Sequence, residues 1–380
     1  MIRSYSGLDP ATGRPLTVRV TDGRIVDVSA STGKVEGWLA PGLVDLQVNG
    51  FAGFDVNGPD VSADTIVELG RALAAAGTTT FAPTVITAAE QGIVASLRAV
   101  AAARDADKAT RDAIPFVHVE GPHLSPEDGP RGAHPLEHIR PPDVEEFARW
   151  QRACGGLVGI VTLSPHYAES PGYVTALSRA GVSVAVGHTG ANPEQITATV
   201  DAGATFSTHL GNGAHAMLPR HQNHLWTQLA DDRLTAGFIA DGHHLPADAL
   251  TAMVRAKGIE RSLLVSDSVA LAGSEPGEYE TPVGGTVQLS TDGRLSHVGT
   301  PYLAGAARSL ADDVASAVGL ARVRLGDAVR MATANPGRFT GGRGILRPGA
   351  QADLVHFDWA PGDTTLRLRS VVRSGSEVSW

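Results

Sequence analysis

The stretch that decides the fold is Ile114-Pro-Phe-Val-His-Val-Glu-Gly-Pro-His123. Its apolar and β-branched residues, followed by a Gly-Pro turn, predict a short buried strand. Glu120 stands at the end of this strand, where burying a carboxylate is costly unless it has a partner. The apolar runs that precede His188, His209 and Asp267 close in the same way. If the four strands lie parallel in one barrel, their last side chains converge, which predicts a metal site with an acid/base beside it.

Further strand-like segments alternate with helix-like runs through the middle of the chain. Several helix-like runs begin with Pro and stop at Gly, which are typical helix boundaries. Eight strands interleaved with helices form the (β/α)8 pattern, an α/β fold whose active site lies at the C-terminal ends of the strands. The expected strands are residues 43–48, 78–83, 114–120, 157–163, 182–188, 204–209, 235–241 and 263–267.

The two ends of the chain have a different pattern from the middle. Residues 1–42 and 341–380 carry short alternating strands and turns, among them the hairpin signal Thr21-Asp-Gly-Arg24. We therefore predict a small β-sandwich built from both termini beside a barrel of residues 43–340. Residues 273–294, rich in Gly, Pro, Thr and Glu, are expected to form an inserted hairpin or a cover over the active site.

The composition excludes several classes of function. The chain has 380 residues, 42% of them hydrophobic, and a net charge of −9, which argues against nucleic acid or an anionic membrane as the main partner but leaves a local basic pocket open. Cys154 is the single cysteine, so we expect no intrachain disulfide and a reducing cytoplasm. The N-terminus lacks the pattern of a signal peptide, and no apolar run is long enough to span a bilayer.

A series of short motifs runs along almost the whole chain. They are Pro41-Gly-Leu-Val-Asp45, His118-Val-Glu-Gly-Pro122, Gly187-His-Thr189, Thr208-His-Leu210, Ala240-Asp-Gly242, Leu264-Val-Ser-Asp267, Met331-Ala-Thr-Ala-Asn-Pro336 and Gly349-Ala-Gln-Ala-Asp-Leu354. Together they resemble the amidohydrolase superfamily and, within it, the N-acetylglucosamine-6-phosphate deacetylase family. The resemblance implies a terminal β-sandwich, a (β/α)8 barrel, a homodimer and deacetylation of a 6-phosphorylated N-acetylamino sugar.

By this resemblance, Glu120, His188 and His209 match the metal ligands, and Asp267 matches the catalytic acid/base. Many superfamily members bind two metals through a His-x-His motif on the first barrel strand, where this chain has Gln47-Val-Asn49. Neutral amides are poor substitutes for imidazole on zinc. We therefore predict one divalent ion per chain, zinc first, with iron, manganese or cobalt as alternatives, and we expect Gln47 to hold the water or to line the pocket.

Amide hydrolysis needs help on both sides of the scissile bond. A divalent ion lowers the pKa of water to about 7 and polarises the acetyl carbonyl. Asp267 would accept a proton as water attacks and pass it to the departing nitrogen. His134 or His123 is expected to assist at the oxyanion, and the resemblance favours His134 as the histidine that touches the substrate.

The resemblance also assigns a set of substrate-binding residues. Asn212 and Gly213 align with the pair that holds the sugar phosphate, and Arg220 with a phosphate-binding arginine that the partner subunit can supply. His244, rather than His243, matches the substrate-binding histidine. Leu303 lies in the segment that resembles the loop over the acetyl group and sugar ring.

Other functions fit the sequence less well. The runner-up is a related amidohydrolase that deacetylates another N-acetylated amino sugar or an N-acyl metabolite without phosphate. A cyclic-amide hydrolase is disfavoured because His-x-His is missing and residues 157–163 contain no lysine for carbamylation. A non-catalytic sugar sensor would have no need for Asp267 beside a complete ligand set. A lone His is more often a packed core residue, and for His118 the core and supporting interpretations both stay open.

Overall fold

The computed structural model describes residues 2–281, 285–300 and 302–379, and its centre is an eight-stranded parallel sheet. The strand order is β14-β13-β12-β11-β10-β9-β8-β5, the chain order of a (β/α)8 barrel. Parallel bridges from Val48 to Ser268 and from Ser268 to Ala306 join the first strand to the segment after the last one, so the sheet nearly closes on itself. The strands are β5 (Leu43–Val48), β8 (Thr78–Ile86), β9 (Val117–Glu120), β10 (Val158–Leu163), β11 (Ser183–Val186), β12 (Phe206–Ser207), β13 (Thr235–Phe238) and β14 (Ser262–Leu264).

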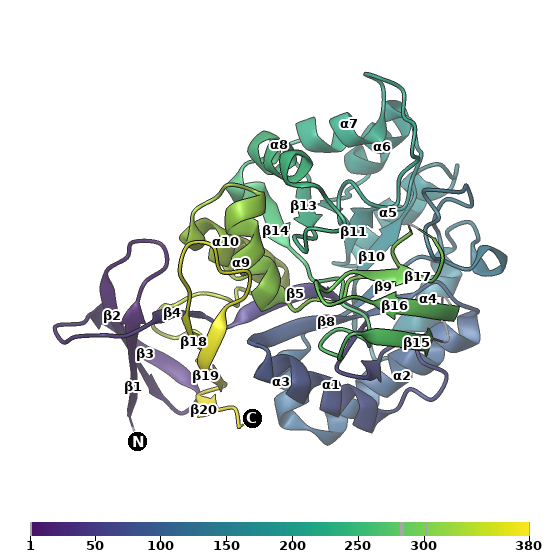
Figure 1. Ribbon diagram of the computed structural model, residues 1–380. Helices are drawn as coiled ribbons and strands as arrows, with labels where there is room; N and C mark the ends of the chain where they lie inside the picture. The colour runs from purple at the N-terminus through teal and green to yellow at the C-terminus, as the bar shows by residue number, and fades with distance from the viewer. Residues whose placement is uncertain (1, 282–284, 301, 380) are drawn as a thin grey trace.

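Helices fill the connections between these strands, which confirms the predicted fold class (Figure 1). Local sequence sets several of their starts. The side chains of Ser62, Asn192 and Ser309 each accept a hydrogen bond from the third residue of the helix that follows, in a capping box. The helices are α1 (Ala63–Ala75), α2 (Glu90–Ala106), α3 (Lys108–Ala113), α4 (Val144–Ala153), α5 (Ser170–Arg179), α6 (Pro193–Asp201), α7 (His224–Ala230), α8 (Ala247–Lys257), α9 (Leu310–Leu320), α10 (Leu325–Met331) and α11 (Ala334–Gly337), with short 3-10 turns η1 (Leu136–His138), η2 (Ile259–Arg261) and η3 (Arg338–Thr340).

A second sheet combines both ends of the chain and lies beside the barrel with the two termini (Figure 1). Its order is β20-β19-β18-β4-β1-β2-β3, and β18 pairs antiparallel with β4. It has its own apolar core, which includes Val18, Leu39 and Leu354. The exact division at residues 42 and 340 stays a prediction. The strands are β1 (Arg3–Leu8), β2 (Pro15–Thr21), β3 (Arg24–Ala30), β4 (Trp38–Pro41), β18 (Leu354–Asp358), β19 (Arg367–Arg373) and β20 (Ser376–Glu377).

Two small sheets complete the fold at the C-terminal ends of the barrel strands. The segment of residues 273–294 contributes to a three-stranded antiparallel sheet, β15 (Gly277–Thr281), β16 (Gly285–Leu289) and β17 (Leu295–His297). This sheet packs its apolar side on Val269 and Leu271, just after Asp267, so the insertion lies next to the end of the barrel that carries the predicted site. The other sheet pairs β6 (Gly50–Phe51) with β7 (Phe54–Asp55).

Candidate active site

The structure brings the three predicted metal ligands together. Glu120 is the last residue of β9, and His188 and His209 each follow their strands, β11 and β12, by two residues. Glu120 Oε1 lies 2.9 Å from His209 Nε2 and 3.2 Å from His188 Nε2, and the two imidazole nitrogens are 3.1 Å apart. All three residues are buried. Strands that are distant along the chain thus deliver one carboxylate and two imidazoles to the same end of the barrel.

The backbone at these positions is unusual. His188, His209 and Asp267 have positive φ values of 48°, 24° and 50°. A non-glycine residue rarely adopts this region, because it costs free energy that the surrounding structure must supply. Such backbone is concentrated at active sites, and here three strand ends share it. The sharp bend after each strand is therefore part of how the side chains are aimed.

The geometry of the cluster suits a cation. His188 Nδ1 lies 2.9 Å from the carbonyl oxygen of Pro130, which can only accept, so Nδ1 carries a proton and Nε2 faces the cluster. There it meets a carboxylate oxygen of Glu120. Electron-rich atoms this close require a shared proton or a metal ion between them. A carboxylate with two imidazoles is a donor set typical of catalytic zinc.

Protons can also hold these groups together. Burial disfavours a charge on His209, but its bond to Glu120 and the nearby carboxylates together raise the pKa of the imidazole to about 9. Burial also opposes charge on Glu120, yet the hydrogen bonds from His188 and His209 hold its pKa well below the usual range. The carboxylate is therefore ionised and His209 carries a proton, which a metal ion must displace in order to bind.

His134 joins the cluster from the long loop that follows β9. Its Nε2 lies 3.3 Å from His188 Nε2, and its Nδ1 lies 2.9 Å from Thr87 Oγ1. Glu120, His134 and His188 have ligand atoms within 4.8 Å of one another, so the loop adds a third imidazole to the site. His123, the other candidate from this segment, instead stacks on Trp150, with ring centroids 5.6 Å apart, in the apolar layer outside the strands.

Asp267 lies at the same end of the barrel, three residues after β14. Its backbone N–H donates to the Gln47 carbonyl at 3.0 Å, and its Oδ1 accepts from Asn49 Nδ2 at 2.7 Å. Burial and the charge of Glu120 raise the pKa of Asp267. The carboxylate is therefore close to the cluster and more basic than an exposed aspartate, as a proton-transferring group requires.

The side-chain amides of Gln47, on the first barrel strand β5, and of Asn49, just after it, have a role that sequence reasoning missed. Gln47 Nε2 lies 3.2 Å from both oxygens of Glu120, while Asn49 bonds Asp267. Gln47 is fully buried, and its amide group holds the Glu120 carboxylate in position. The spacing i, i+2, which places both side chains on one face of a strand, was the available signal.

His118 supports the barrel wall beneath the cluster. Its Nδ1 lies 3.1 Å from the Leu46 carbonyl oxygen, and its Nε2 lies 2.7 Å from Thr162 Oγ1. Burial lowers its pKa to about 4, so the ring is neutral. These contacts join β5, β9 and β10 two residues before Glu120. Both ring nitrogens of His118 have a hydrogen-bond partner.

Comparison with known proteins identifies the family. The profile described as "Amidohydrolase family" matches residues 38–378. The chain belongs to the amidohydrolase family.

Relatives of this amidohydrolase include two kinds of sugar-phosphate deacetylase. It is 34% identical to the N-acetylgalactosamine-6-phosphate deacetylase of Shewanella sp. (strain ANA-3), over 85% of this chain and 79% of that protein. It is 32% identical to the N-acetylglucosamine-6-phosphate deacetylase of Bacillus subtilis (strain 168), over 73% of this chain and 74% of that protein.

The fold of this amidohydrolase is also similar to a solved structure. The N-acetyl-D-glucosamine-6-phosphate deacetylase of Mycobacterium smegmatis superposes with a TM-score of 0.89 at 28% identity, covering 99% of this chain and 100% of that one.

The predicted substrate residues of the amidohydrolase lie in loops around the cluster. Asn212 and Gly213 line a small cavity of about 10 Å³ beside His188. Gly213 has φ +58°, and an added Cβ would come within 2.6 Å of His188 Nδ1, so only glycine fits. His215, in the same loop, pairs with Glu127 of the loop after β9 at 2.9 Å. The loop that carries Asn212 and Gly213 is thereby joined to the loop that carries His134.

The remaining predicted substrate residues differ in exposure. His244 Nδ1 lies 2.7 Å from Asp241 Oδ2, which fixes the ring so that Nε2 is free to meet a ligand. Leu303 is half-buried and bridges to Ser296 of β17, beside the inserted sheet. Arg220 is exposed on the loop before α7. Their roles toward a substrate stay predictions. No helix in the described part of the chain has the length and hydropathy needed to cross a membrane.

Proposed function

We propose that this amidohydrolase is a metal-dependent deacetylase that hydrolyses N-acetylglucosamine 6-phosphate to glucosamine 6-phosphate and acetate. The observation that carries the proposal is the convergence of Glu120, His188 and His209, with Asp267 beside them, at the C-terminal end of the barrel. The two relatives compared above bear the names of deacetylases of sugar 6-phosphates. Both observations point to hydrolysis of an acetamide.

Glu120, His188 and His209 are the residues that would hold one divalent ion. Zinc is the first candidate because carboxylate and imidazole ligands suit it, and iron, manganese and cobalt are alternatives. When bound, such an ion supplies a Lewis acid that polarises the acetyl carbonyl and lowers the pKa of water to about 7. Gln47 keeps both oxygens of Glu120 in place for this task.

Asp267 moves the proton. Its raised pKa lets the carboxylate take a proton from the attacking water and then release it to the leaving nitrogen, which must be protonated to depart. Asn49 holds one carboxylate oxygen, so the other is oriented for the transfer. His134, with its Nδ1 fixed by Thr87, presents Nε2 where a developing oxyanion can be stabilised.

The phosphate would be recognised by the neighbouring loops. Asn212, Gly213 and His244 lie around the cluster, and Leu303 lies beside the inserted sheet, from where it would cover the sugar ring. Arg220 is exposed, so its guanidinium is available to a phosphate in the site of a partner subunit. We therefore also propose a homodimer, which sedimentation velocity tests. We place the enzyme in the cytoplasm, where the free and buried Cys154 stays reduced.

A second candidate substrate is N-acetylgalactosamine 6-phosphate, because the 34% identical relative carries the name of that deacetylase. The two sugars differ only in the configuration of one hydroxyl group. Acetate release should be measured from both phosphorylated sugars and from unphosphorylated N-acetylglucosamine. The proposal expects the highest kcat/KM for N-acetylglucosamine 6-phosphate. A preference for the galactosamine derivative selects the second candidate, and equal rates without the phosphate contradict both.

The Arg220→Ala variant tests the phosphate assignment. We expect KM for the phosphorylated sugar to rise about tenfold or more, since a charge-assisted bond to phosphate is lost. Activity on the unphosphorylated sugar should be unchanged. Arg152→Ala is the matched control, because Arg152 is an exposed arginine on α4. An equal loss on both substrates would remove Arg220 from phosphate recognition.

A further inference from the structure

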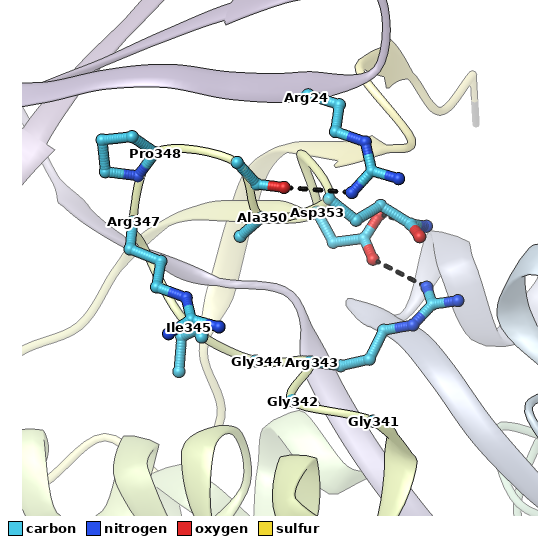
Figure 2. Close-up of a pocket in the computed structure, with 12 residues that line it drawn as sticks. Arg24, Gly341, Gly342, Arg343, Gly344, Ile345, Arg347, Pro348, Ala350 and Asp353 are labelled. Carbon is cyan, nitrogen blue, oxygen red and sulfur yellow. Dashed lines mark hydrogen bonds and ion pairs between the residues drawn. The ribbon is translucent and has the colours of Figure 1, made fainter.

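A cleft of about 450 Å³ lies between the terminal sheet and the loop that leads into β18 (Figure 2). Its walls are residues 341–345 and 347–351, together with Asp353 and Arg24, which begins β3. None of these residues belongs to the candidate active site. The volume falls within the range of small-molecule sites, but the walls are largely polar, unlike those of a site for an apolar ligand.

Three arginines make this cleft strongly basic in a chain whose net charge is −9. They are Arg24, Arg343 and Arg347, and the single acidic residue in the wall is Asp353. Asp353 is buried and already engaged, because it accepts from the Ser374 N–H at 2.7 Å and pairs with Arg343 at 3.4 Å. The local excess of positive charge is therefore not neutralised by the wall itself.

The guanidinium groups are only partly used. Arg24 Nη1 donates to the carbonyl oxygen of Gly349 at 3.0 Å, which leaves its other donors free. Arg347 is exposed, and within the described residues its side chain has neither a hydrogen bond nor an ion pair. A role confined to stabilising the fold explains Arg343, which pairs with Asp353 across the loop, but it does not explain Arg347.

The loop that carries Arg343 and Arg347 is rich in glycine, so few side chains project from it. Gly342 and Gly349 both have φ +86°, a conformation that favours glycine, and an added Cβ at either would meet open space. The lack of side chains there leaves the main chain of the loop open to a ligand in the cleft. Planar guanidinium groups match the oxygens of a phosphate, with two parallel hydrogen bonds from each.

We propose that this cleft is a second ligand site, which binds the phosphate group of a small phosphorylated metabolite. The cleft is larger than an inorganic phosphate needs, so the remaining space accommodates the organic part of a phosphomonoester. Binding there is independent of the deacetylase reaction, since the lining residues and the active-site residues do not overlap.

Isothermal titration calorimetry on the full-length protein tests this site, with inorganic phosphate and glucose 6-phosphate as the two probes. The pocket variant is Arg24→Ala/Arg347→Ala. The control is Arg14→Ala/Arg152→Ala, which removes the same charge from two exposed arginines outside the cleft. Arg347→Gln alone is a milder second variant, because Arg347 is exposed and its removal does not break a described contact.

We expect the pocket variant to bind at least one of the probes about tenfold more weakly than wild type or worse, with the control unchanged. Because the proposed active site also recognises sugar phosphates, only binding that is lost in the pocket variant and kept in the control is assigned to the cleft. A larger loss for glucose 6-phosphate than for phosphate identifies a phosphomonoester as the occupant, and the reverse identifies free phosphate. Equal affinities in wild type and pocket variant, or an equal loss in both double variants, would overturn the proposal. Acetate release by the pocket variant should match wild type, which separates this site from the proposed catalytic one.

Discussion

The support that Gln47 gives to Glu120 yields a sharp prediction about metal affinity. Replacing Gln47 with Leu removes the amide that contacts both carboxylate oxygens at 3.2 Å. Hydrogen bonds to charged groups contribute about 1.5–3 kcal/mol, and these contacts lie at the long end of the N–H···O range. We therefore expect a loss of about 1.5–2 kcal/mol in metal binding, or about 10- to 30-fold in Kd.

The substitution should leave the fold intact. Gln47 is fully buried, and its Oε1 has no hydrogen-bond partner among the described residues. Leu has no such oxygen, so the substitution removes the free-energy cost of burying it. A competition titration with a colorimetric chelator measures the metal Kd of the purified variant directly. At saturating metal, kcat should stay close to that of wild type, because Gln47 contacts the ligand and not the proton-transferring group.

Asn49→Leu is the matched control, two residues further along the chain. Asn49 donates to Asp267 at 2.7 Å, so its loss should lower kcat and leave the metal Kd unchanged. The opposite pattern, in which Asn49→Leu weakens metal binding and Gln47→Leu does not, would refute the assigned contacts. An unchanged metal Kd in Gln47→Leu would show that Glu120 needs no support from the first strand.

Three further changes test other parts of the molecule. Asp267→Asn should retain its metal and lose nearly all turnover, as metal analysis and acetate release will show; retained activity would remove Asp267 from proton transfer. Burial raises the pKa of Asp45 from 3.8 to about 7, so its contribution to stability is present at low pH and is lost as the pH rises through about 7. The Tm difference between Asp45→Asn and wild type should therefore become more positive from about pH 5 to about pH 8, and a constant difference would contradict the raised pKa. Trp150→Ala empties a fully buried position and should cost about 3–5 kcal/mol in unfolding free energy, measured by urea denaturation, whereas a cost below about 1 kcal/mol would show that the site repacks.

Much of the barrel could be predicted from the sequence because each strand is a short apolar run between clear helix boundaries. The predicted strand ends, however, extend too far. β12 ends at Ser207 rather than His209, and β14 ends at Leu264 rather than Asp267. The reason is the backbone, which bends into the left-handed region at His209 and Asp267 and so leaves the ladder. Apolar pattern alone does not reveal this bend.

The supporting contacts of the site were harder to predict. Gln47 on β5 and Glu120 on β9 meet although β8 lies between their strands in the sheet, so their contact depends on the curvature of the barrel. His134 contacts His188 from an irregular loop, and a hydrophobic pattern in the sequence does not predict the path of such a loop. His123 occupies a comparable place in the sequence, yet it packs against Trp150 because the turn after Glu120 directs it outward.

Metal content is the most direct test of the account. Inductively coupled plasma mass spectrometry on the purified chain should find about one divalent ion per polypeptide, and His188→Ala and His209→Ala should each lose it while keeping a folded circular dichroism spectrum. Two ions per chain, or a full metal complement in both histidine variants, would show that these imidazoles and Glu120 do not form the single site on which the proposed chemistry depends.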